Sequence, residues 1–445
     1  MSGRDFSIGR VNESRPNGPS GGRSFLAELE WRGLLAEESV GLRTRLARAP
    51  ISAYIGFDAS ARSLHVGNLL QVFLLAHLQR SGGTPFVVVG GATGMIGDPS
   101  GKSSERNLLD DETIATNSAA IRGQLESFLD FTAGPAQAQM VNNLDWLGEY
   151  RLLDFLRDVG KHFSVPYMLA KESVKLRLDS GMSFTEFSYM TLQSADFLHL
   201  LRERGVEMQM GGADQWGNIT AGLELIRRVL GRVEGEEPAA FGLCSPLLLT
   251  RSGQKMGKSE RGAVFLDPRL TSPYDFYQYW LNDDDALVGR HLRWLTLLAP
   301  DEVYALEEEQ QRAPEQRAAQ RALAFDLTAR VHGREEAERQ MRVAEAVFSG
   351  QPIRDADILD ALFTELEGFE FGAAEVADGA LGLAVASGLY QSRGEARRQI
   401  NQGGLSINDE RVTDPSAPVP EPIGGRYLVL RAGKKRLMIG RRRDS

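Results

Sequence analysis

Cysteine is almost absent from this sequence, with Cys244 as the single example among 445 residues. One cysteine excludes an internal disulfide and a zinc site built from several cysteines, and it fits a reducing cytosol. The six histidines are scattered and form no His-x-x-His pair, so we expect no dedicated metal site made of protein side chains. Because the sequence contains no long apolar run, no transmembrane helix is predicted, and we expect a cytoplasmic protein without membrane contact.

Charge is unevenly distributed along the chain. The net charge is −9, but residues 380–445 hold 12 Lys/Arg and 6 Asp/Glu, so their balance of +6 leaves −15 for the other 379 residues. A basic terminal module on an acidic body indicates a polyanionic partner at that end. A basic surface that only faces solvent is the alternative explanation, because blocks of charge are often no more than that.

The length predicts several domains, because a single hydrophobic core stops growing well below this size. Residues 1–24 are rich in Gly, Ser, Arg, Asn and Pro and lack apolar periodicity, which predicts a disordered tail. The four arginines of this tail suggest a transit peptide, but Asp5, Glu13 and the missing apolar face argue against one.

Alternating strand and helix patterns then predict an α/β catalytic domain over residues 25–272. Helical spacing runs through residues 25–48. The expected strands are 52–57, 85–89, 139–142 and 207–210, and the expected helices are 65–80, 111–130, 150–158, 183–203 and 216–230. Strands separated by helices pair in parallel, so this order predicts an open Rossmann-like parallel sheet with helices on both faces.

The pattern changes after residue 272. Residues 273–350 lack strand signals and predict an all-helical domain, whereas residues 351–379 predict a linker with some helix. Residues 380–445 predict a small α+β domain. Its expected helices are 381–387 and 393–402, and its expected strands are 404–408, 426–431 and 435–439.

Two Gly-Lys-Ser triplets, at residues 101–103 and 257–259, suggest a P-loop that their spacing excludes. A P-loop has four residues between its first glycine and the Gly-Lys pair. Only three residues separate Gly97 from Gly101, and Gly253 from Gly257. No Gly-x-Gly-x-x-Gly pattern fits residues 90–101 either, so P-loop ATPases and dinucleotide-dependent dehydrogenases are excluded.

Two other segments carry groups suited to a polyphosphate. His65 and Asn68 are three residues apart and project from the first turn of an expected helix, where the backbone N–H groups favour an anion. We expect Gly67, between them, to leave space for a ligand near the backbone. Lys255 and Lys258 stand in a polar loop and can reach a polyphosphate as mobile charges. A capping histidine and a solvated loop are the alternatives when each segment is taken alone.

The expected helix 183–203 is mostly apolar, yet Tyr189, Gln193 and Asp196 lie on one of its faces. A buried carboxylate there requires a hydrogen-bond donor, and a phenol hydroxyl could supply it. An ordinary salt bridge is the alternative for Asp196. Residues 211–218 follow the next expected strand, so they lie at the edge of the sheet where ligands bind.

These segments resemble the class I aminoacyl-tRNA synthetases. Residues 58–68 resemble the "HIGH" signature with Asn68 for its last histidine, and residues 255–259 resemble the "KMSKS" loop with Gly257 for its first serine. Because residues 90–106, 184–196 and 211–218 match in order as well, the chain is similar to bacterial tyrosyl-tRNA synthetases over residues 30–440. The resemblance implies a ligase that activates L-tyrosine with ATP, whose Mg²⁺ ATP itself carries, and transfers the tyrosine to tRNA(Tyr).

The resemblance also implies a role for each matching residue. Tyrosine would be bound by Tyr54, Asp98, Asn143, Tyr189, Gln193, Asp196 and Gln215, with Tyr54 and Asp196 holding the phenol. ATP would be bound by Asp58, Ser60, His65, Asn68, Asp214, Lys255, Lys258 and Ser259. Four of these would be catalytic, acting mainly in the transition state: His65, Asn68, Lys255 and Lys258. Ser60 stands where the family often has threonine.

Contacts with tRNA and with a second copy of the chain are implied in the same way. Lys102 and Arg106 would contact tRNA near the site, the helical domain would lie on the anticodon side, and a homodimer would form through the catalytic domains near Phe184. Residues 383–408 resemble a small RNA-binding module first seen in a ribosomal protein. Three arginines of this module, Arg393, Arg397 and Arg398, would form one basic helix face for phosphates.

Three other functions are alternatives to this interpretation. A tryptophanyl-tRNA synthetase is the nearest, and Asp196 with Tyr54 argues instead for a phenol substrate. An RNA-binding protein with an inactive synthetase body is a second rival, against which the intact set of His65, Asp196 and Lys258 argues. The third is a nucleotidyltransferase of cofactor synthesis, which the basic C-terminal module argues against.

Overall fold

The structure is a computed structural model. It describes residues 23–59, 61–99, 110–171, 174–175, 181–233, 236–259, 262–348, 351–433 and 436–443. Two compact units divide this part of the chain. The first comprises the residues up to Thr271 together with Trp280–Val331, and the second comprises Ser272–Tyr279 and the residues from His332 onward. Within the described ranges, no helix is long and apolar enough to cross a membrane.

The first unit is built on a six-stranded sheet in the order β1-β6-β5-β2-β3-β4. Its strands are β1 (Glu37–Glu38), β2 (Ser52–Phe57), β3 (Thr84–Val89), β4 (Gln139–Asn142), β5 (Met208–Gly212) and β6 (Phe241–Ser245). All neighbouring pairs are parallel except β1 with β6, which confirms the expected α/β fold class. The sequence pattern missed β6, whose five residues are all buried.

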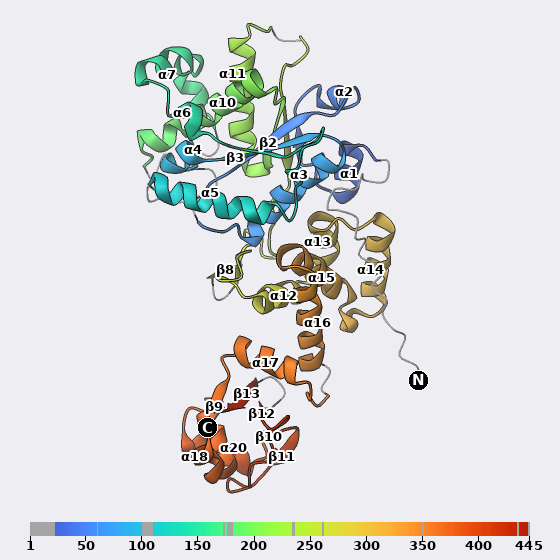
Figure 1. Cartoon of the computed structure of the whole chain (residues 1–445). Helices are drawn as coiled ribbons and strands as arrows, with labels where there is room; N and C mark the ends of the chain where they lie inside the picture. Colours follow the sequence, from blue (N-terminus) through green and yellow to red (C-terminus); the bar gives the residue numbers. More distant parts are fainter. Residues whose placement is uncertain are drawn as a thin grey trace. The chain divides into compact units, whose positions relative to one another are not determined.

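Helices cover both faces of this sheet (Figure 1): α3 (Leu69–Arg80) and α5 (Asp111–Leu125) lie on one side, and α10 (Phe184–Arg204) and α11 (Trp216–Val229) lie on the other. The ends of α10 have clear local causes. The hydroxyl of Ser183 accepts the N–H of Glu186 at the N-terminus, and Gly205 ends the helix with φ +65°. Since α10 presents one face to the sheet, its buried polar residues lie inside the domain.

The expected helix over residues 25–48 is wrong. Helix α1 ends at Arg32, because Gly33 takes a left-handed conformation with φ +71°. Strand β1 and the short helix α2 (Leu42–Leu46) follow. The apolar residues keep a helical spacing beyond the end of α1. The end of the helix is therefore apparent only in the structure, where the next residues form β1 and pair with β6.

The position of the site follows from the strand order. Strand β2 lies between β3 and β5, and the chain moves outward from β2 in one direction through β3 and β4, and in the other through β5 and β6. In open parallel sheets a ligand binds in the crevice where the connections diverge, which here is the position beyond the carboxyl ends of β2 and β5. Three short helices begin near these strand ends: η1 (Val66–Asn68), α4 (Gly91–Ile96) and η3 (Ala213–Gln215).

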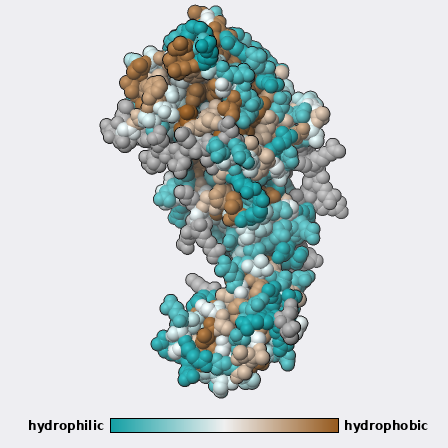
Figure 2. Space-filling model, turned by 60° about the vertical axis from the view of Figure 1, so that its left-hand side comes forward, coloured by the Kyte–Doolittle hydropathy of each residue, from teal (hydrophilic) through white to brown (hydrophobic). Residues whose placement is uncertain are grey.

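Exposed apolar side chains gather on one flank of the first unit. Helices α7 (Leu152–Asp158) and α8 (Val165–Leu169) and the first turn of α10 carry them; Figure 2 shows brown side chains in the upper part of the molecule, where α7 comes forward. The residues are Leu152, Leu153, Leu156, Val165, Leu169 and Phe184. Leu153 and Phe184 are 76% and 77% exposed. We call these six residues the apolar flank.

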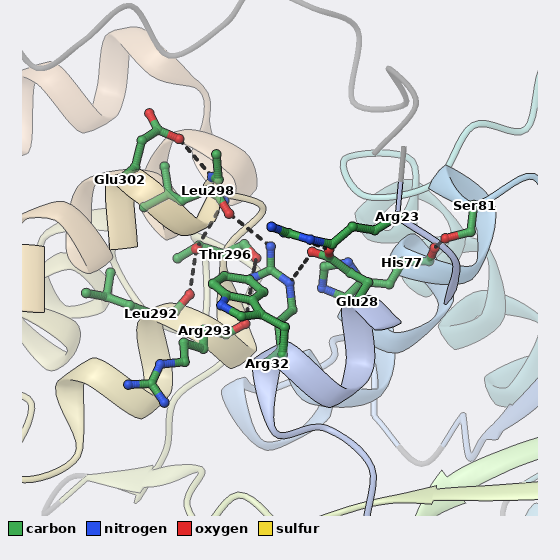
Figure 3. Close-up of polar contacts among 12 residues, drawn as sticks. Arg23, Glu28, Arg32, His77, Ser81, Leu292, Arg293, Thr296, Leu298 and Glu302 are labelled. Carbon is green, nitrogen blue, oxygen red and sulfur yellow. Dashed lines mark hydrogen bonds and ion pairs between the residues drawn. The ribbon is translucent and has the colours of Figure 1, made fainter. Parts of the chain in front are cut away.

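The first unit also contains helices from the segment expected to be all-helical, namely α13 (Val288–Leu295), α14 (Pro300–Arg312) and α15 (Ala318–His332). Arg32, at the end of α1, connects the N-terminal region to them (Figure 3). Its buried guanidinium donates to Glu28 at 2.7 Å and to the carbonyl oxygens of Arg293, Thr296 and Leu298 at 2.6, 2.9 and 2.9 Å. Arg32 therefore satisfies carbonyl groups at the end of α13 that would otherwise lack donors.

The second unit is a five-stranded sheet in the order β11-β10-β12-β13-β9, with helices on both faces. Its strands are β9 (Phe369–Phe371), β10 (Leu405–Ile407), β11 (Glu410–Val412), β12 (Tyr427–Ala432) and β13 (Arg436–Arg442). Along β12, Leu428 and Leu430 pack with α19 (Gly379–Ala386) and α20 (Arg393–Asn401). Tyr427 and Val429 pack with α16 (Arg334–Phe348) and α17 (Ala356–Glu365) on the opposite face.

These units do not follow the segment boundaries that the sequence suggested. The helices of residues 273–350 are divided between the two units. The stretch 351–379, expected as a linker with some helix, contains α17, β9 and α18 (Ala373–Ala377), and β9 pairs in parallel with β13. Since β9 and β13 are about 70 residues apart in sequence, local patterns gave no indication of this pairing.

Candidate active site

The helix start at residues 65–68 is held by a reciprocal cap. The Nδ1 atom of His65 accepts the N–H of Gly67 at 3.1 Å, and the Oδ1 atom of Asn68 accepts the N–H of His65 at 3.0 Å. Capping was the alternative explanation for this histidine. The structure shows that the cap uses the Nδ1 atom of His65.

The loop that carries the two lysines packs directly against this helix start. Val66 donates its N–H to the carbonyl of Val264 at 2.9 Å, and Val264 donates to the carbonyl of Gly257 at 3.0 Å. His65 also forms a β-bridge with Phe265. The two signature segments, about 190 residues apart in the sequence, therefore share one hydrogen-bonded edge.

Gly67 is also required by a close contact with the lysine loop. A Cβ atom at this position would lie 2.8 Å from the carbonyl oxygen of Met256 and 2.9 Å from the ring of His65. The backbone of the lysine loop, and not only a ligand, therefore requires glycine here. Gly257 approaches the same place: its φ is +129°, and a Cβ atom would lie 3.3 Å from Nδ1 of His65. The glycine that replaces the first serine of "KMSKS" thus fits the close contact of the two segments.

Lys255 reaches back to the sheet. Its ammonium group forms an ion pair with the Oδ2 atom of Asp214 at 2.6 Å, and Asp214 lies in η3, directly after β5. Lys258 and Ser259 form strand β7, which pairs with β8 (Gly262–Ala263); their side chains lie outside the described part. Asp58 follows β2 and lies close to Gly90, where an added Cβ atom would be 3.0 Å from its Oδ1 atom.

Asp196 is a buried carboxylate with two neutral donors. It is 3% exposed, its Oδ2 atom accepts from Asn143 at 2.9 Å, and its Oδ1 atom accepts from the indole N–H of Trp146 at 2.8 Å. Burial raises the pKa of Asp196 to about 7, although the hydrogen bonds from Asn143 and Trp146 oppose the shift. The salt-bridge alternative does not describe this carboxylate, because both of its donors are uncharged.

The hydroxyl group of Tyr54 lies inside the same domain without a partner. Tyr54 stands on β2 and is 2% exposed, and its ring packs edge-on against Phe197 with centroids 5.4 Å apart. Its hydroxyl oxygen is buried and has no hydrogen-bond partner among the described residues. Burial, and then the charge of Asp196, raise the pKa of Tyr54 well above its usual value, so the two groups lie within electrostatic reach of each other.

Gln193 of α10 belongs to a network of hydrogen-bonded amide side chains. Gln215 donates to Asp98 at 2.7 Å and accepts from Gln193 at 3.3 Å. Asn218 donates to Gln193 and Gln215 at 3.2 and 3.3 Å. Tyr189 is buried one turn before Gln193 on the same helix. Gln193 thus belongs to this network, whereas Asp196, on the same helix, is bound by Asn143 and Trp146.

Two comparisons identify the family. A family model described as "tRNA synthetases class I (W and Y)" matches residues 46–349, and one described as "Tyrosine--tRNA ligase SYY-like C-terminal domain" matches residues 362–439. The tyrosine–tRNA ligase of Bacillus caldotenax is 48% identical over 421 residues, which cover 93% of this chain and 98% of that protein. That of Anaeromyxobacter dehalogenans is 50% identical over 422 residues, with the same coverage. The chain belongs to the tyrosine–tRNA ligase family.

Solved structures agree with this assignment. A C-terminally truncated mitochondrial tyrosyl-tRNA synthetase of Aspergillus nidulans superposes with a TM-score of 0.65 at 30% identity, covering 73% of this chain and 94% of that one. A tryptophanyl-tRNA synthetase of Plasmodium falciparum shares the fold at a TM-score of 0.50 and 14% identity, covering 74% of this chain and 86% of that one. Since both amino acid specificities use this fold, the fold alone does not choose between them. The sequence relatives do, and they confirm the expected ligase class, its use of ATP, and the activation of tyrosine for tRNA charging.

Several expected site residues of the ligase lie outside the described part, namely Ser60, Lys102 and Arg106. Three residues with structural roles in the site were not expected: Trp146 and Asn218, which form the contacts above, and Thr93, whose hydroxyl accepts from Asn143 at 2.8 Å. For Trp146, the sequence offered one indication, its position three residues after Asn143. Asn143 itself, expected to touch tyrosine, uses both of its amide hydrogens on Thr93 and Asp196.

The three arginines of α20, in the second unit, differ in whether they are already paired with an acidic residue. Arg393 is paired with Asp378 at 2.6 Å, whereas the side chains of Arg397 and Arg398 are exposed. Among the residues described, no group of three or more His, Cys, Asp or Glu could hold a metal ion.

Proposed function

We propose that the crevice beyond β2 and β5 binds L-tyrosine and Mg²⁺-ATP, joins them as tyrosyl-adenylate, and passes the tyrosyl group to the terminal adenosine of tRNA(Tyr). The observation that carries the residue assignment is the pair of Tyr54 and Asp196. Among the described residues, the buried hydroxyl of Tyr54 has no hydrogen-bond partner and the buried carboxylate of Asp196 has only neutral donors, and the charge of Asp196 acts on Tyr54. Both groups are satisfied when a phenol hydroxyl donates to Asp196 and accepts from Tyr54.

Selection of tyrosine over phenylalanine follows from this arrangement. With phenylalanine, the hydroxyl of Tyr54 stays unpaired and Asp196 gains no third donor, and an unmade buried hydrogen bond costs about 1–3 kcal/mol for each group. Asn143 acts behind Asp196 in this scheme, because its amide hydrogens are already used.

The amide network suits the other end of the amino acid. Asp98 supplies a carboxylate for the tyrosine ammonium group, and Tyr189 and Gln193 of α10 provide further polar atoms. Gln215 is hydrogen-bonded to both Asp98 and Gln193, so it fixes the geometry of this end and lies near the tyrosine carboxylate.

Activation of ATP is assigned to the shared edge of the two signature segments. Asp58, Ser60, Asp214 and Ser259 bind ATP, and Mg²⁺ enters with ATP as part of the substrate. His65, Asn68, Lys255 and Lys258 stabilise the charge that develops as the tyrosine carboxylate attacks the α-phosphorus and pyrophosphate leaves. Before ATP binds, Lys255 is held by its ion pair with Asp214. When ATP binds, the negative charge of the triphosphate attracts this lysine away from Asp214.

Transfer requires tRNA, and we assign part of its binding to the second unit. Arg397 and Arg398 are exposed on α20, so they can neutralise phosphates, whereas Arg393 must first leave Asp378. Lys102 and Arg106 remain tRNA contacts by resemblance, and the helical segment is proposed to face the anticodon side.

A homodimer through the catalytic domains is the proposed assembly. The apolar flank supports it, because Phe184 and its five neighbours expose large apolar side chains on one side of the unit. A cytoplasmic location is proposed with it, since Cys244 is buried as a free thiol. Sedimentation at nanomolar concentration tests the dimer, and a fully active monomer would disprove it.

The direct test of function is tyrosine-dependent exchange of pyrophosphate into ATP, with tyrosine, phenylalanine and tryptophan compared. We expect exchange with tyrosine alone. Asp196→Asn should raise the KM for tyrosine and reduce discrimination against phenylalanine, while the matched variant Asp145→Asn, an exposed carboxylate on α6 (Leu144–Leu147), should change neither. Unchanged discrimination in Asp196→Asn would remove this residue from the tyrosine site.

A further inference from the structure

Asp196 depends on an unusually small set of donors. Within the part of the chain that the structure describes, its hydrogen bonds come from Asn143 and Trp146, and no cation contributes to its pKa. Hydrogen bonds to the ionised form are what keep a buried carboxylate charged. Losing one of the two donors would therefore leave a buried carboxylate with a single hydrogen bond, and protonation would become easier.

The indole of Trp146 is held from two directions by the same helix. Its N–H donates to Asp196, and its ring lies flat on the imidazole of His199, with centroids 4.5 Å apart and planes inclined by 10°. Asp196 and His199 are three residues apart on α10, so they lie on adjacent positions of one helix face. Burial lowers the pKa of His199, which favours the neutral form of the stacked imidazole.

The backbone around Trp146 provides little restraint by itself. Helix α6 has only four residues, and a helix of one turn has no stability of its own. The orientation of the indole therefore depends on its packing, and His199 supplies a flat surface against its face. A small rotation of the ring would move the N–H out of line with the Oδ1 atom of Asp196, and hydrogen bonds weaken steeply with such misalignment.

We propose that His199 is a positioning residue for tyrosine recognition: by stacking on Trp146 it holds the indole N–H on Asp196, and thereby keeps this carboxylate directed at the tyrosine hydroxyl. The inference rests on the proposed assignment of Asp196 to that hydroxyl. His199 has no contact with substrate in this scheme and acts only through the indole. A residue that merely filled space beside α6 would affect stability and leave substrate selection unchanged.

The experiment compares His199→Ala, His199→Leu and His199→Phe in pyrophosphate exchange with tyrosine and with phenylalanine. Alanine removes the surface, leucine restores bulk without a flat face, and phenylalanine restores the flat face without ring nitrogens. We expect alanine and leucine to raise the KM for tyrosine about 2- to 12-fold, the size of an aromatic pair contribution, with kcat changed less than about 2-fold and discrimination against phenylalanine reduced. Phenylalanine should restore both. Arg202→Ala, an exposed position on the same helix, is the control and should match the unchanged enzyme.

A spectroscopic measurement separates positioning from general damage. In protein labelled with ¹⁵N-tryptophan, the indole N–H signal of Trp146 is assigned by its loss in Trp146→Phe. We expect this signal to move toward weaker hydrogen bonding in His199→Ala and His199→Leu, and to return in His199→Phe. An unmoved signal together with unchanged discrimination in folded alanine or leucine variants would overturn the proposal, as would a lowered melting temperature with no change in the KM for tyrosine.

Asp196→Asn, measured alongside, distinguishes the two levels of the argument. If this substitution abolishes discrimination and the His199 variants do not, the role of His199 is wrong and the assignment of Asp196 stands. If Asp196→Asn leaves discrimination intact, the assignment of Asp196 is wrong. If the alanine variant does not fold, the contrast between leucine and phenylalanine decides the outcome, because both keep the volume and only phenylalanine keeps the stacking surface.

Discussion

Replacing Asp196 with asparagine should make the unliganded enzyme more stable at pH 8, even though it impairs tyrosine binding. The reason is the cost of the buried charge. Burial raises the pKa of Asp196 from 3.8 to about 7, and each pKa unit corresponds to about 1.4 kcal/mol. The ionised carboxylate therefore lowers the stability of the folded state by about 4 kcal/mol once the pH exceeds 7.

Asparagine removes this charge but introduces a mismatch. One of its two polar atoms becomes an NH₂ group, which meets the NH₂ group of Asn143 where the carboxylate oxygen accepted at 2.9 Å. An unsatisfied buried donor costs about 1–3 kcal/mol. The difference leaves a net stabilisation of about 1–3 kcal/mol at pH 8.

The sign depends on pH. Because the folded pKa is raised, the wild-type carboxyl is neutral in both states below pH 3.8, carries no penalty there, and loses stability progressively as the pH rises from about 4 to 7. The asparagine variant does not titrate at this position. Its advantage should therefore shrink on acidification and reverse near pH 4, where only the mismatch with Asn143 remains.

Urea unfolding of both proteins without ligands, followed from pH 4 to pH 8, measures this difference through the change of midpoint. Asp145→Asn, at an exposed position of α6, removes the same charge without burial and should leave the pH profile of stability unchanged. An Asp196→Asn protein that is less stable than wild type at pH 8, or whose stability falls with pH in parallel with wild type, would refute the argument that burial of this charge is costly.

Other sites allow equally direct tests. His65→Ala should raise the activation barrier to adenylate formation by about 3–4 kcal/mol, with little change in the KM for ATP. A raised KM for ATP at an unchanged rate in stopped-flow measurements would contradict this. Gly67→Ala should slow the same step, since the added Cβ atom would displace the carbonyl of Met256 from 2.8 Å at a cost of about 1–3 kcal/mol; exchange assays check it, and full activity would show that the loop adapts. Arg397→Ala with Arg398→Ala should leave pyrophosphate exchange intact and reduce the salt dependence of tRNA binding by roughly one to two phosphate contacts, and filter binding over a salt series measures that slope.

The parallel sheet could be predicted from the sequence because its signals are local. Strands β2 and β4 lie at the expected residues, and α10 differs by one residue at each end. Their apolar runs are bounded by turn residues, so each element is visible without knowledge of its partners. Strand β6 was missed, although it is buried throughout like β5, which was expected.

Part of the arrangement of the candidate site could also be predicted, since charged and polar side chains recur at spacings set by a helix turn. His65 with Asn68, and Tyr189 with Gln193 and Asp196, were placed on common faces by spacing alone. In the structure His65 caps η1, which ends at Asn68, and the other three residues lie on α10. What resemblance added was the amino acid that the pocket takes.

Only the tertiary structure decided which groups surround Asp196 and which close contact requires a glycine at position 67. Trp146 and Asn143 meet this carboxylate from about 50 residues away, and Met256 meets Gly67 from about 190 residues away. Such contacts depend on the packing of separate elements, which no local pattern encodes. The sequence by itself therefore determined the fold class and the family, whereas the burial that raises the pKa of Asp196, the burial of the Tyr54 hydroxyl and the stack of His199 on Trp146 exist only once those elements are packed together.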